Sequence, residues 1–156
     1  MADFEIETLT SQPFAYIPLT AKMPEMPRVM GEGFDRLSAA FADAKAEMAG
    51  MPLCHYTDYD EQSATFELGF PARPDQVEAL RAAGLSIGET PSGRSMKATH
   101  IGPYDTIVET YNKMTEAMKK QGLEGTKDMW ESYFSPPDTP PEQLRTDVIW
   151  PVREAA

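Results

Sequence analysis

The segment DMWESYFSPP places one carboxylate, Glu131, among aromatic side chains. The aromatic residues favour a β-strand, and the two prolines at the end of the segment predict that the strand stops there. Carboxylates are uncommon in strands and costly to bury without a partner, so Glu131 needs an explanation. Strand alternation predicts that Glu131 and Tyr133 share one face of the strand, whereas Trp130 lies on the other face.

Glu131 has more than one interpretation at this point. It is either a solvated charge on the exposed face of an antiparallel sheet, or an anion at the floor of an aromatic-lined cleft. In such a cleft the carboxylate can pair with a cationic ligand, and each aromatic face adds cation–π attraction of roughly 0.5–2 kcal/mol. A carboxylate removed from water can instead serve as a general base.

A second candidate region is the segment THIGPYDTI. Gly102 and Pro103 predict a turn between a strand and a helix, and Asp105 is a suitable N-cap for that helix. Tyr104 lies in this turn, where a role in a pocket and a role in packing fit equally well. His100 has no partner histidine or acid at ligand spacing, so we expect it to be structural.

Several other kinds of chemistry are not expected. Cys54 and His55 are adjacent, and neighbouring strand residues point to opposite faces, so they are not expected to form a catalytic pair. The two histidines and the single cysteine match no zinc spacing, and no phosphate-binding glycine loop is present. We therefore predict neither a metal nor a cofactor, and we expect Cys54 to be a buried structural residue.

The composition limits the class of protein. The chain has 156 residues, which favours a single domain, and its formal net charge of −11 disfavours a nucleic-acid-binding surface. One cysteine provides no internal disulfide, and the first ten residues do not resemble a signal peptide. No apolar run is long enough for a membrane span, so we expect a cytoplasmic protein.

Two segments have the periodicity of an amphipathic helix. Residues 27–49 carry apolar residues at alternating gaps of four and three, and Gly50 is expected to end this helix. Residues 106–121 show the same gaps, with Gly122 as the stop. A shift of 77 positions superposes the two apolar faces, placing Met30, Phe34, Leu37 and Phe41 on Ile107, Tyr111, Met114 and Met118.

The strands repeat with nearly the same shift. A shift of 77 places Cys54 on Glu131 and Tyr56 on Tyr133, and a shift of 80 in the next strand places Phe70 on Trp150. A structural position is expected to look alike in both halves, so a cysteine at the place of Glu131 favours the cleft interpretation. The predicted strands lie within residues 14–23, 54–60 and 64–72 of the first half and within residues 95–101, 131–137 and 145–152 of the second, with a further strand at 4–9.

These elements predict an α+β fold made of a tandem β-α-β-β repeat. Its strands are expected to be antiparallel, with two long helices, pseudo-two-fold symmetry and a cleft between the halves. We predict one domain over residues 1–156, with the first half at about 1–72, a linker at 73–93 and the second half at about 94–153. Within the linker, residues 75–83 favour a short helix and the remainder a loop.

Together the motifs resemble a known family. The strings HIGPYDTIVETYNKM and WESYFSPPDTPPEQLRTDVIWPV, with Gly122-Leu123 between them, are similar to the GyrI-like small-molecule-binding family. This family includes effector-binding domains of AraC- and MerR-type regulators and stand-alone gyrase-inhibitory-protein homologues. The similarity is strong over residues 94–152 and diffuse over the first half. Because no helix remains for a helix-turn-helix, we expect a stand-alone member without direct nucleic-acid binding.

The resemblance implies a site as well as a fold. It implies that Glu131 faces bound hydrophobic cations in a cleft lined by tyrosines and tryptophans, as in multidrug recognition. Some stand-alone members hydrolyse reactive cyclopropane-bearing compounds, which implies catalytic roles for Glu131 and Tyr133 if this chain is an enzyme. The usual Asp-Pro after the Glu-x-Tyr strand is here Pro136-Pro137, and MPEMPR replaces Gly-Pro-Tyr in the first half, so the first-half wall of the pocket stays undefined.

Three functions follow as hypotheses. The first is binding of a hydrophobic small molecule, cations included, for sequestration or sensing. The second is a hydrolase of electrophilic small molecules, for which Glu67, Glu109 and Asp147 are equal candidates as a second acid. The third is interaction with a protein partner such as a topoisomerase. The candidate ligand-binding residues are Glu131, Tyr133, Tyr104, Tyr111, Trp150, Tyr56, Phe70 and Trp130.

Overall fold

The computed structural model describes residues 4–103, 106–134 and 139–155. The chain forms two compact units, which we name after the repeat that each contains. The first-repeat unit comprises Ser11–Thr90, and the second-repeat unit comprises Met1–Thr10 together with Pro91–Ala156. None of the described helices is long and apolar enough to cross a membrane.

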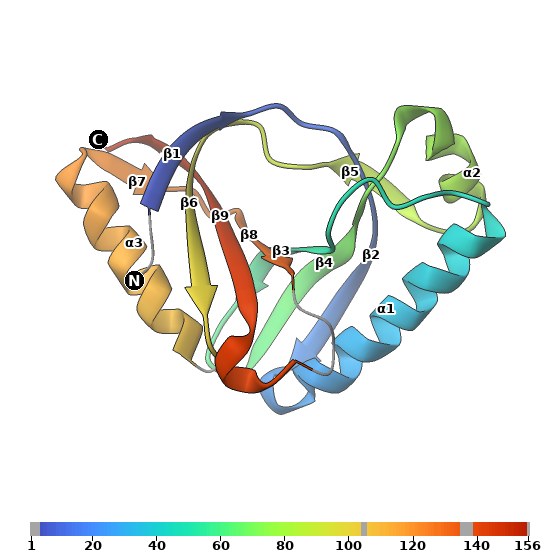
Figure 1. Ribbon diagram of the computed structural model, residues 1–156, viewed down its shortest axis with the longest axis horizontal. Coiled ribbons are helices and arrows are strands. Elements are labelled where there is room, and N and C mark those ends of the chain that lie inside the picture. Colours follow the sequence, from blue (N-terminus) through green and yellow to red (C-terminus); the bar gives the residue numbers. More distant parts are fainter. Residues whose placement is uncertain (1–3, 104–105, 135–138, 156) are drawn as a thin grey trace. The chain divides into compact units, whose positions relative to one another are not determined.

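The first-repeat unit is an antiparallel sheet with one long helix packed on it. Its strands follow the order β3-β4-β2-β5. Helix α1 (Met26–Asp43) packs on β2 and β4, and a short helix α2 (Val77–Ala82) precedes β5 (Figure 1). The 3₁₀ turns Met23–Glu25 and Pro74–Gln76 lead into α1 and α2. The strands are β2 (Pro13–Lys22), β3 (Leu53–Tyr59), β4 (Ser63–Pro71) and β5 (Ser86–Glu89).

Helix α1 ends six residues before the predicted end at Ala49. Lys45 adopts a positive φ of 54°, and its N–H donates to the carbonyl of Ala42 at 3.1 Å. The N–H of Ala46 donates to the carbonyl of Phe41 at 2.9 Å, which completes a Schellman cap. The predicted end was wrong because a lysine, rather than the more common glycine, takes the left-handed position.

The second-repeat unit has the same construction. Its strands follow the order β1-β6-β9-β8, and the short strand β7 pairs with the end of β9. Helix α3 (Ile107–Lys120) covers one face and buries Met114 and Met118 in a core with Met96, Ala98, Leu123 and Val148. A 3₁₀ turn at Pro141–Gln143 precedes β9. The strands are β1 (Phe4–Leu9), β6 (Gly93–Ile101), β7 (Leu123–Gly125), β8 (Met129–Tyr133) and β9 (Arg145–Glu154).

The strand registers of the two units agree with the predicted repeat. Cys54 of β3 lies opposite Leu68 of β4, and Glu131 of β8 lies opposite Val148 of β9. These pairs differ by 77 positions in one strand and by 80 in the other, as the sequence predicted. The α+β class with antiparallel strands is confirmed, whereas the cleft between the halves stays a prediction.

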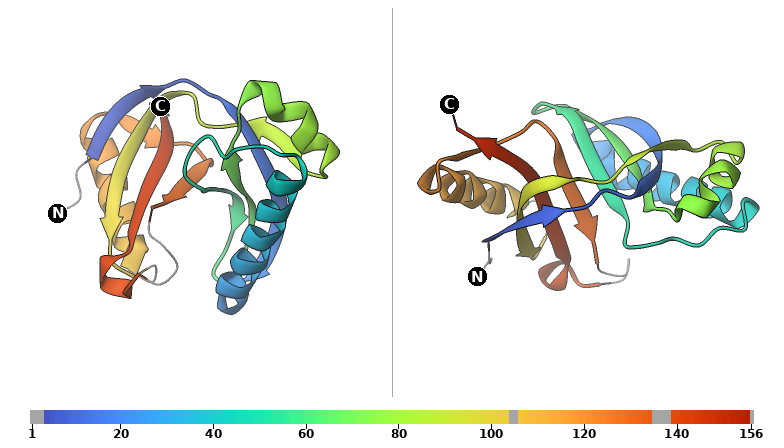
Figure 2. Two further views of the ribbon diagram at one scale, coloured as in Figure 1. Left: turned by 45° about the vertical axis from the view of Figure 1, so that its right-hand side comes forward. Right: turned by 90° about the horizontal axis from the view of Figure 1, so that it is seen from above.

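The edge strands differ from the expected organisation. β1 precedes the first repeat in the chain but pairs with β6 of the second (Figures 1 and 2). β5 lies in the predicted linker, where residues after Ala83 were expected to form a loop, and it pairs with β2. Each repeat therefore obtains its outer strand from the segment that precedes the other repeat. A strand as short as β5 is stabilised by its tertiary pairing, which local sequence does not reveal. The single domain over residues 1–156 stays a prediction.

Candidate functional site

Glu131 is buried on β8, with only 6% of its surface exposed, so it is not a solvated surface charge. Both carboxylate oxygens accept hydrogen bonds from phenols. The hydroxyl of Tyr111 donates to Oε2 at 2.7 Å, and the hydroxyl of Tyr133 donates to Oε1 at 2.9 Å. Hydrogen bonds to an ionised acceptor are stronger than neutral ones, so two of them offset part of the cost of burying a carboxylate.

Two elements of the second-repeat unit bring these three side chains together. Tyr133 follows Glu131 by two positions on β8 and therefore lies on the same face of the sheet. Tyr111 comes from α3, which covers that face. Because Glu131 lies opposite Val148, a core residue beneath α3, its side chain occupies the helix-covered side of the sheet.

Trp150 adds an indole ring to this group. Its ring centroid lies 5.7 Å from that of Tyr111, with the two ring planes at 71°. Its Nε1 donates to the carbonyl of Thr126 at 2.7 Å, which orients the ring. A side chain at Gly125 would come within 2.3 Å of the indole, so the glycine provides the space for Trp150. Sequence reasoning missed Gly125 and Thr126, although a glycine shortly before a strand-forming aromatic segment is a recognisable signal.

The first-repeat unit holds the same arrangement in apolar form. The rings of Phe34 on α1 and Phe70 on β4 make an edge contact at 6.2 Å, which corresponds to the edge contact of Tyr111 with Trp150 at 5.7 Å. Cys54, at the position of Glu131, is fully buried. The fold therefore accommodates apolar side chains at all three positions. The carboxylate, the phenol and the indole of the second-repeat unit are not needed to fill this space.

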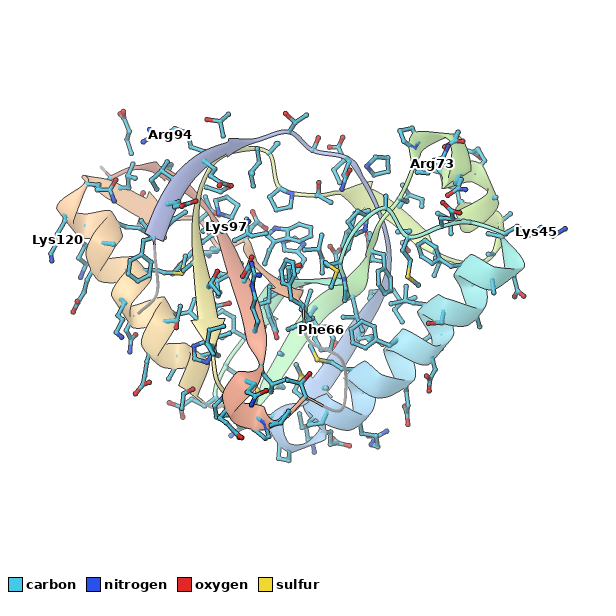
Figure 3. The ribbon with its side chains drawn as sticks, in the orientation of Figure 1. Lys45, Phe66, Arg73, Arg94, Lys97 and Lys120 are labelled. Carbon is cyan, nitrogen blue, oxygen red and sulfur yellow. The ribbon has the colours of Figure 1, made fainter. Side chains whose placement is uncertain are left out.

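The remaining candidates lie in other surroundings. Phe70 packs against Phe34 and Phe41 of α1 and is buried in the core of its own unit. Tyr56 is half-buried, and its ring lies beside that of Phe66 on β4; Phe66 is labelled in Figure 3. Trp130 lies on the face of β8 opposite to Glu131, as alternation predicted, and Tyr104 lies outside the described residues. The structure thus brings together Glu131, Tyr133, Tyr111 and Trp150.

His100 has a structural environment, as expected. Its Nδ1 lies 2.9 Å from the hydroxyl of Thr110, and its Nε2 lies 3.0 Å from the carbonyl of Pro103. The hydroxyl of Thr106 also donates to this carbonyl at 2.8 Å. These bonds join the end of β6 to the first turns of α3, and so help to hold the helix that carries Tyr111.

The three candidates for a second catalytic acid, Asp147, Glu67 and Glu109, lie in different environments. Asp147 is fully buried and accepts hydrogen bonds from Thr99 at 2.9 Å and from Arg145 at 3.2 Å. It follows Thr146 and precedes Val148, so it lies on the sheet face opposite to Glu131. Glu67 lies 2.8 Å from Nδ1 of His55, and Glu109 is exposed on α3.

Other parts of the molecule offer less to a ligand. In the described ranges, no three His, Cys, Asp or Glu side chains lie together as metal ligands would. An open hollow of about 370 Å³ in the first-repeat unit is lined by Ser11, Gln12, Pro13, Val77, Ile87, Gly88 and Glu89. Glu89 is its one charged group among these described residues, so the hollow has less specific chemistry than the surroundings of Glu131.

Sequence comparison identifies the family. Residues 2–153 match the family described as the GyrI-like small molecule binding domain. The chain belongs to the GyrI-like family. A comparison with curated proteins found no match.

Solved structures share the GyrI-like fold. A hydrolase encoded by lin2189 from Listeria innocua superposes with a TM-score of 0.72 and 18% identity, covering 96% of this chain and 91% of that one. EcmrR in a DNA complex has a TM-score of 0.76 and 14% identity, over 99% of this chain and 58% of that one. SAV2435 bound to tetraphenylphosphonium has a TM-score of 0.65 and 14% identity, over 97% and 94%.

Proposed function

We propose that this GyrI-like protein binds hydrophobic small molecules, organic cations among them, at the site formed by Glu131, Tyr133, Tyr111 and Trp150. One observation carries the proposal. Positions that are filled by Cys54, Phe34 and Phe70 in the first repeat hold a buried carboxylate, a phenol and an indole in the second. The fold does not need these polar atoms, so their presence favours a role in binding.

The chemistry of the site suits a hydrophobic cation. A carboxylate attracts an opposite charge more strongly in a partly dry site than in water, and aromatic faces add cation–π attraction. Tyr111, Tyr133 and Trp150 are partly exposed, whereas Glu131 is buried. A ligand therefore meets the aromatic rings first and reaches the carboxylate by displacing them. The binding of tetraphenylphosphonium by SAV2435, a protein of the same fold, adds support.

Replacing Glu131 tests this proposal. We expect Glu131→Gln to weaken the binding of tetraphenylphosphonium by on the order of 1–3 kcal/mol, because an amide of similar shape removes the charge. Isothermal titration calorimetry measures the affinity. Glu109→Gln is the matched control, because it removes the same charge from an exposed position on α3 and should leave the affinity unchanged. Equal affinities for wild type and Glu131→Gln would remove Glu131 from this role.

A hydrolase is the second candidate, favoured by the two Listeria innocua proteins of this fold that are described as hydrolases. In this scheme Glu131 takes a proton from water while the water oxygen bonds to an electrophilic carbon of the substrate. The electron pair of the broken bond passes to the leaving atom, and Tyr133 and Trp150 hold the substrate. Mass spectrometry after incubation with electrophilic compounds tests it. Absence of any Glu131-dependent hydration product would leave binding as the function.

Fewer observations support the remaining expectations about a protein partner, the location and the organisation of the chain. A protein-interaction role is permitted by the net charge of −11, but no contact among the described residues favours it. The cytoplasmic location and the stand-alone character of the chain stay predictions.

A further inference from the structure

Thr146 on β9 is fully buried, with 0% of its surface exposed. Among the residues that the structure describes, its hydroxyl oxygen Oγ1 has no hydrogen-bond partner. An unpaired buried hydroxyl typically costs about 1–3 kcal/mol of stability. Packing within the second-repeat unit therefore does not explain why a hydroxyl occupies this position.

The strand register places this hydroxyl beside the proposed site. Thr146 lies directly opposite Tyr133, and Val148, two positions further along β9, lies opposite Glu131. Thr146 and Val148 alternate with Asp147, so both face the helix-covered side on which Glu131 lies. Diagonal neighbours on adjacent antiparallel strands are about 7–8 Å apart, which puts Thr146 within the length of one small ligand from Glu131.

The first repeat shows that the fold does not require a hydroxyl here. Phe66 occupies the corresponding position on β4, opposite Tyr56, and is also fully buried (Figure 3). The pair Tyr56–Phe66 thus corresponds to the pair Tyr133–Thr146. Thr146 is a fourth position, after those of Glu131, Tyr111 and Trp150, at which the second repeat carries a polar atom and the first an apolar side chain. The smaller threonine also occupies less space than phenylalanine.

We propose that Thr146 is a specificity-determining residue of the Glu131 site, whose hydroxyl hydrogen-bonds a polar group of the bound ligand. This inference rests on the proposed function. It narrows the ligand class to organic cations that carry an alcohol, amide or ether group next to their aromatic part, in preference to purely hydrocarbon cations. Glu131 supplies charge recognition, and Thr146 supplies the polar contact that distinguishes among cations.

Two probes that differ by one alcohol group test the proposal. The first is tetraphenylphosphonium, which has no hydrogen-bonding group, and the second is [4-(hydroxymethyl)phenyl]triphenylphosphonium. We expect the wild-type protein to bind the alcohol about three- to tenfold more tightly, which corresponds to one hydrogen bond. Thr146→Val keeps the β-branched shape and removes the hydroxyl, so it should abolish this preference. Thr146→Ser should retain it, and serves as the second variant if the valine protein fails to fold.

Ser95 provides a matched control within the same sheet. Its side-chain oxygen is also buried and lacks a partner among the described residues, but Ser95 alternates with the core residue Met96 and faces the opposite side. Ser95→Ala should leave the preference for the alcohol unchanged. Both Thr146→Val and Ser95→Ala should raise the midpoint of thermal unfolding, because each removes an unpaired buried hydroxyl.

The outcomes separate this inference from the proposed function. If wild type binds neither probe, the proposed function fails together with the inference. If Glu131→Gln weakens both probes but Thr146→Val weakens them equally or not at all, the site stands and Thr146 has no role in specificity. A lower unfolding midpoint for Thr146→Val, with the midpoint of Thr146→Ser unchanged, would also overturn the inference, because this pattern would mean that the hydroxyl already has a partner in the free protein.

Discussion

Glu131 was recognisable as an unusual residue from the sequence, before its surroundings in the fold were known. A carboxylate in a strand of aromatics is unusual on propensity alone, and the cysteine at the matching position of the first repeat made it more so. Its burial and its two phenol partners became evident only in the folded chain. Tyr111 was expected on the apolar face of a helix. A buried phenol needs a hydrogen-bond partner, and the structure shows that this partner is Glu131.

Glu67, another carboxylate of the chain, affects the ionisation of the phenol of Tyr16. Burial raises the pKa of Tyr16, and the charge of Glu67 and a hydrogen bond to it raise this pKa further. The phenol is therefore held in its protonated form in the folded protein. The raised pKa stabilises the folded protein at pH values below the pKa of the phenol in the unfolded chain, which is about 10. This stabilisation is lost as the pH rises through the higher pKa of Tyr16 in the folded protein.

Replacing Glu67 should lower the pKa of Tyr16. We expect Glu67→Gln to move this pKa towards the ordinary value without reaching it, because burial is the largest cause of the shift and remains. Ultraviolet absorbance of tyrosinate during an alkaline titration measures the change, and Tyr16→Phe identifies the signal among six tyrosines. An unaltered titration in Glu67→Gln would contradict the coupling between the two groups.

At the scale of elements, the short strand β7 shapes the site although it contributes no candidate residue. Its glycine, Gly125, lies against the indole of Trp150, and the next residue, Thr126, accepts the hydrogen bond of that indole. The first repeat has Met48 at the corresponding position, paired with Ala72, and the smaller ring of Phe70 in place of Trp150. In the second repeat, a glycine and a tryptophan thus occupy the positions that a methionine and a phenylalanine occupy in the first.

A methyl group at Gly125 should therefore displace Trp150. We expect Gly125→Ala to destabilise the protein by about 1–3 kcal/mol, because overpacking forces neighbouring side chains to move. It should also weaken tetraphenylphosphonium binding, since the contact between Trp150 and Tyr111 is lost. Urea unfolding and calorimetry measure the two effects.

Gly31 on α1 is the control for this substitution. A side chain there would meet nothing within 4 Å, so Gly31→Ala should stabilise the protein by roughly 0.5–1 kcal/mol through helix propensity. A neutral or stabilising effect of Gly125→Ala would mean that Trp150 is not held against β7.

At the scale of the whole chain, the two repeats depend on each other for their edge strands. β1 pairs with β6 along its entire length, and Phe4 and Ile6 pack against the core beneath α3. β5 similarly completes the sheet of the first repeat. A cut in the predicted linker before β5 would therefore separate each repeat from a strand that it uses.

Deleting residues 1–9 tests this dependence. We expect the amides of β6 to lose protection from hydrogen exchange, because the deletion exposes an edge of the sheet and removes two apolar side chains from the core. The amides of β2 should keep more of their protection, since β4 and β5 still flank that strand. Mass spectrometry of exchanged peptides resolves the two strands. Equal loss in both would show that the two units unfold as one.

Local patterns determined much of this protein from its sequence alone. Helix and strand periods are properties of consecutive residues, so both long helices and the central strands were predictable, and repetition of the pattern set the shifts of 77 and 80. The identity of Glu131 as an unusual residue was equally local. Even the faces of Trp130 and Tyr133 followed from alternation.

Tertiary structure decided what the local pattern could not. The pairing of β1 with β6 and of β5 with β2 joins segments distant in the sequence, and the same β-pattern would satisfy other partners. The hydrogen bond between Tyr111 and Glu131 and the unpaired hydroxyl of Thr146 depend on positions fixed by packing between elements. The sequence specifies the chemistry of each side chain. The tertiary structure decides which side chains contact one another, because these contacts join residues that are distant in the sequence and become neighbours only when the chain folds.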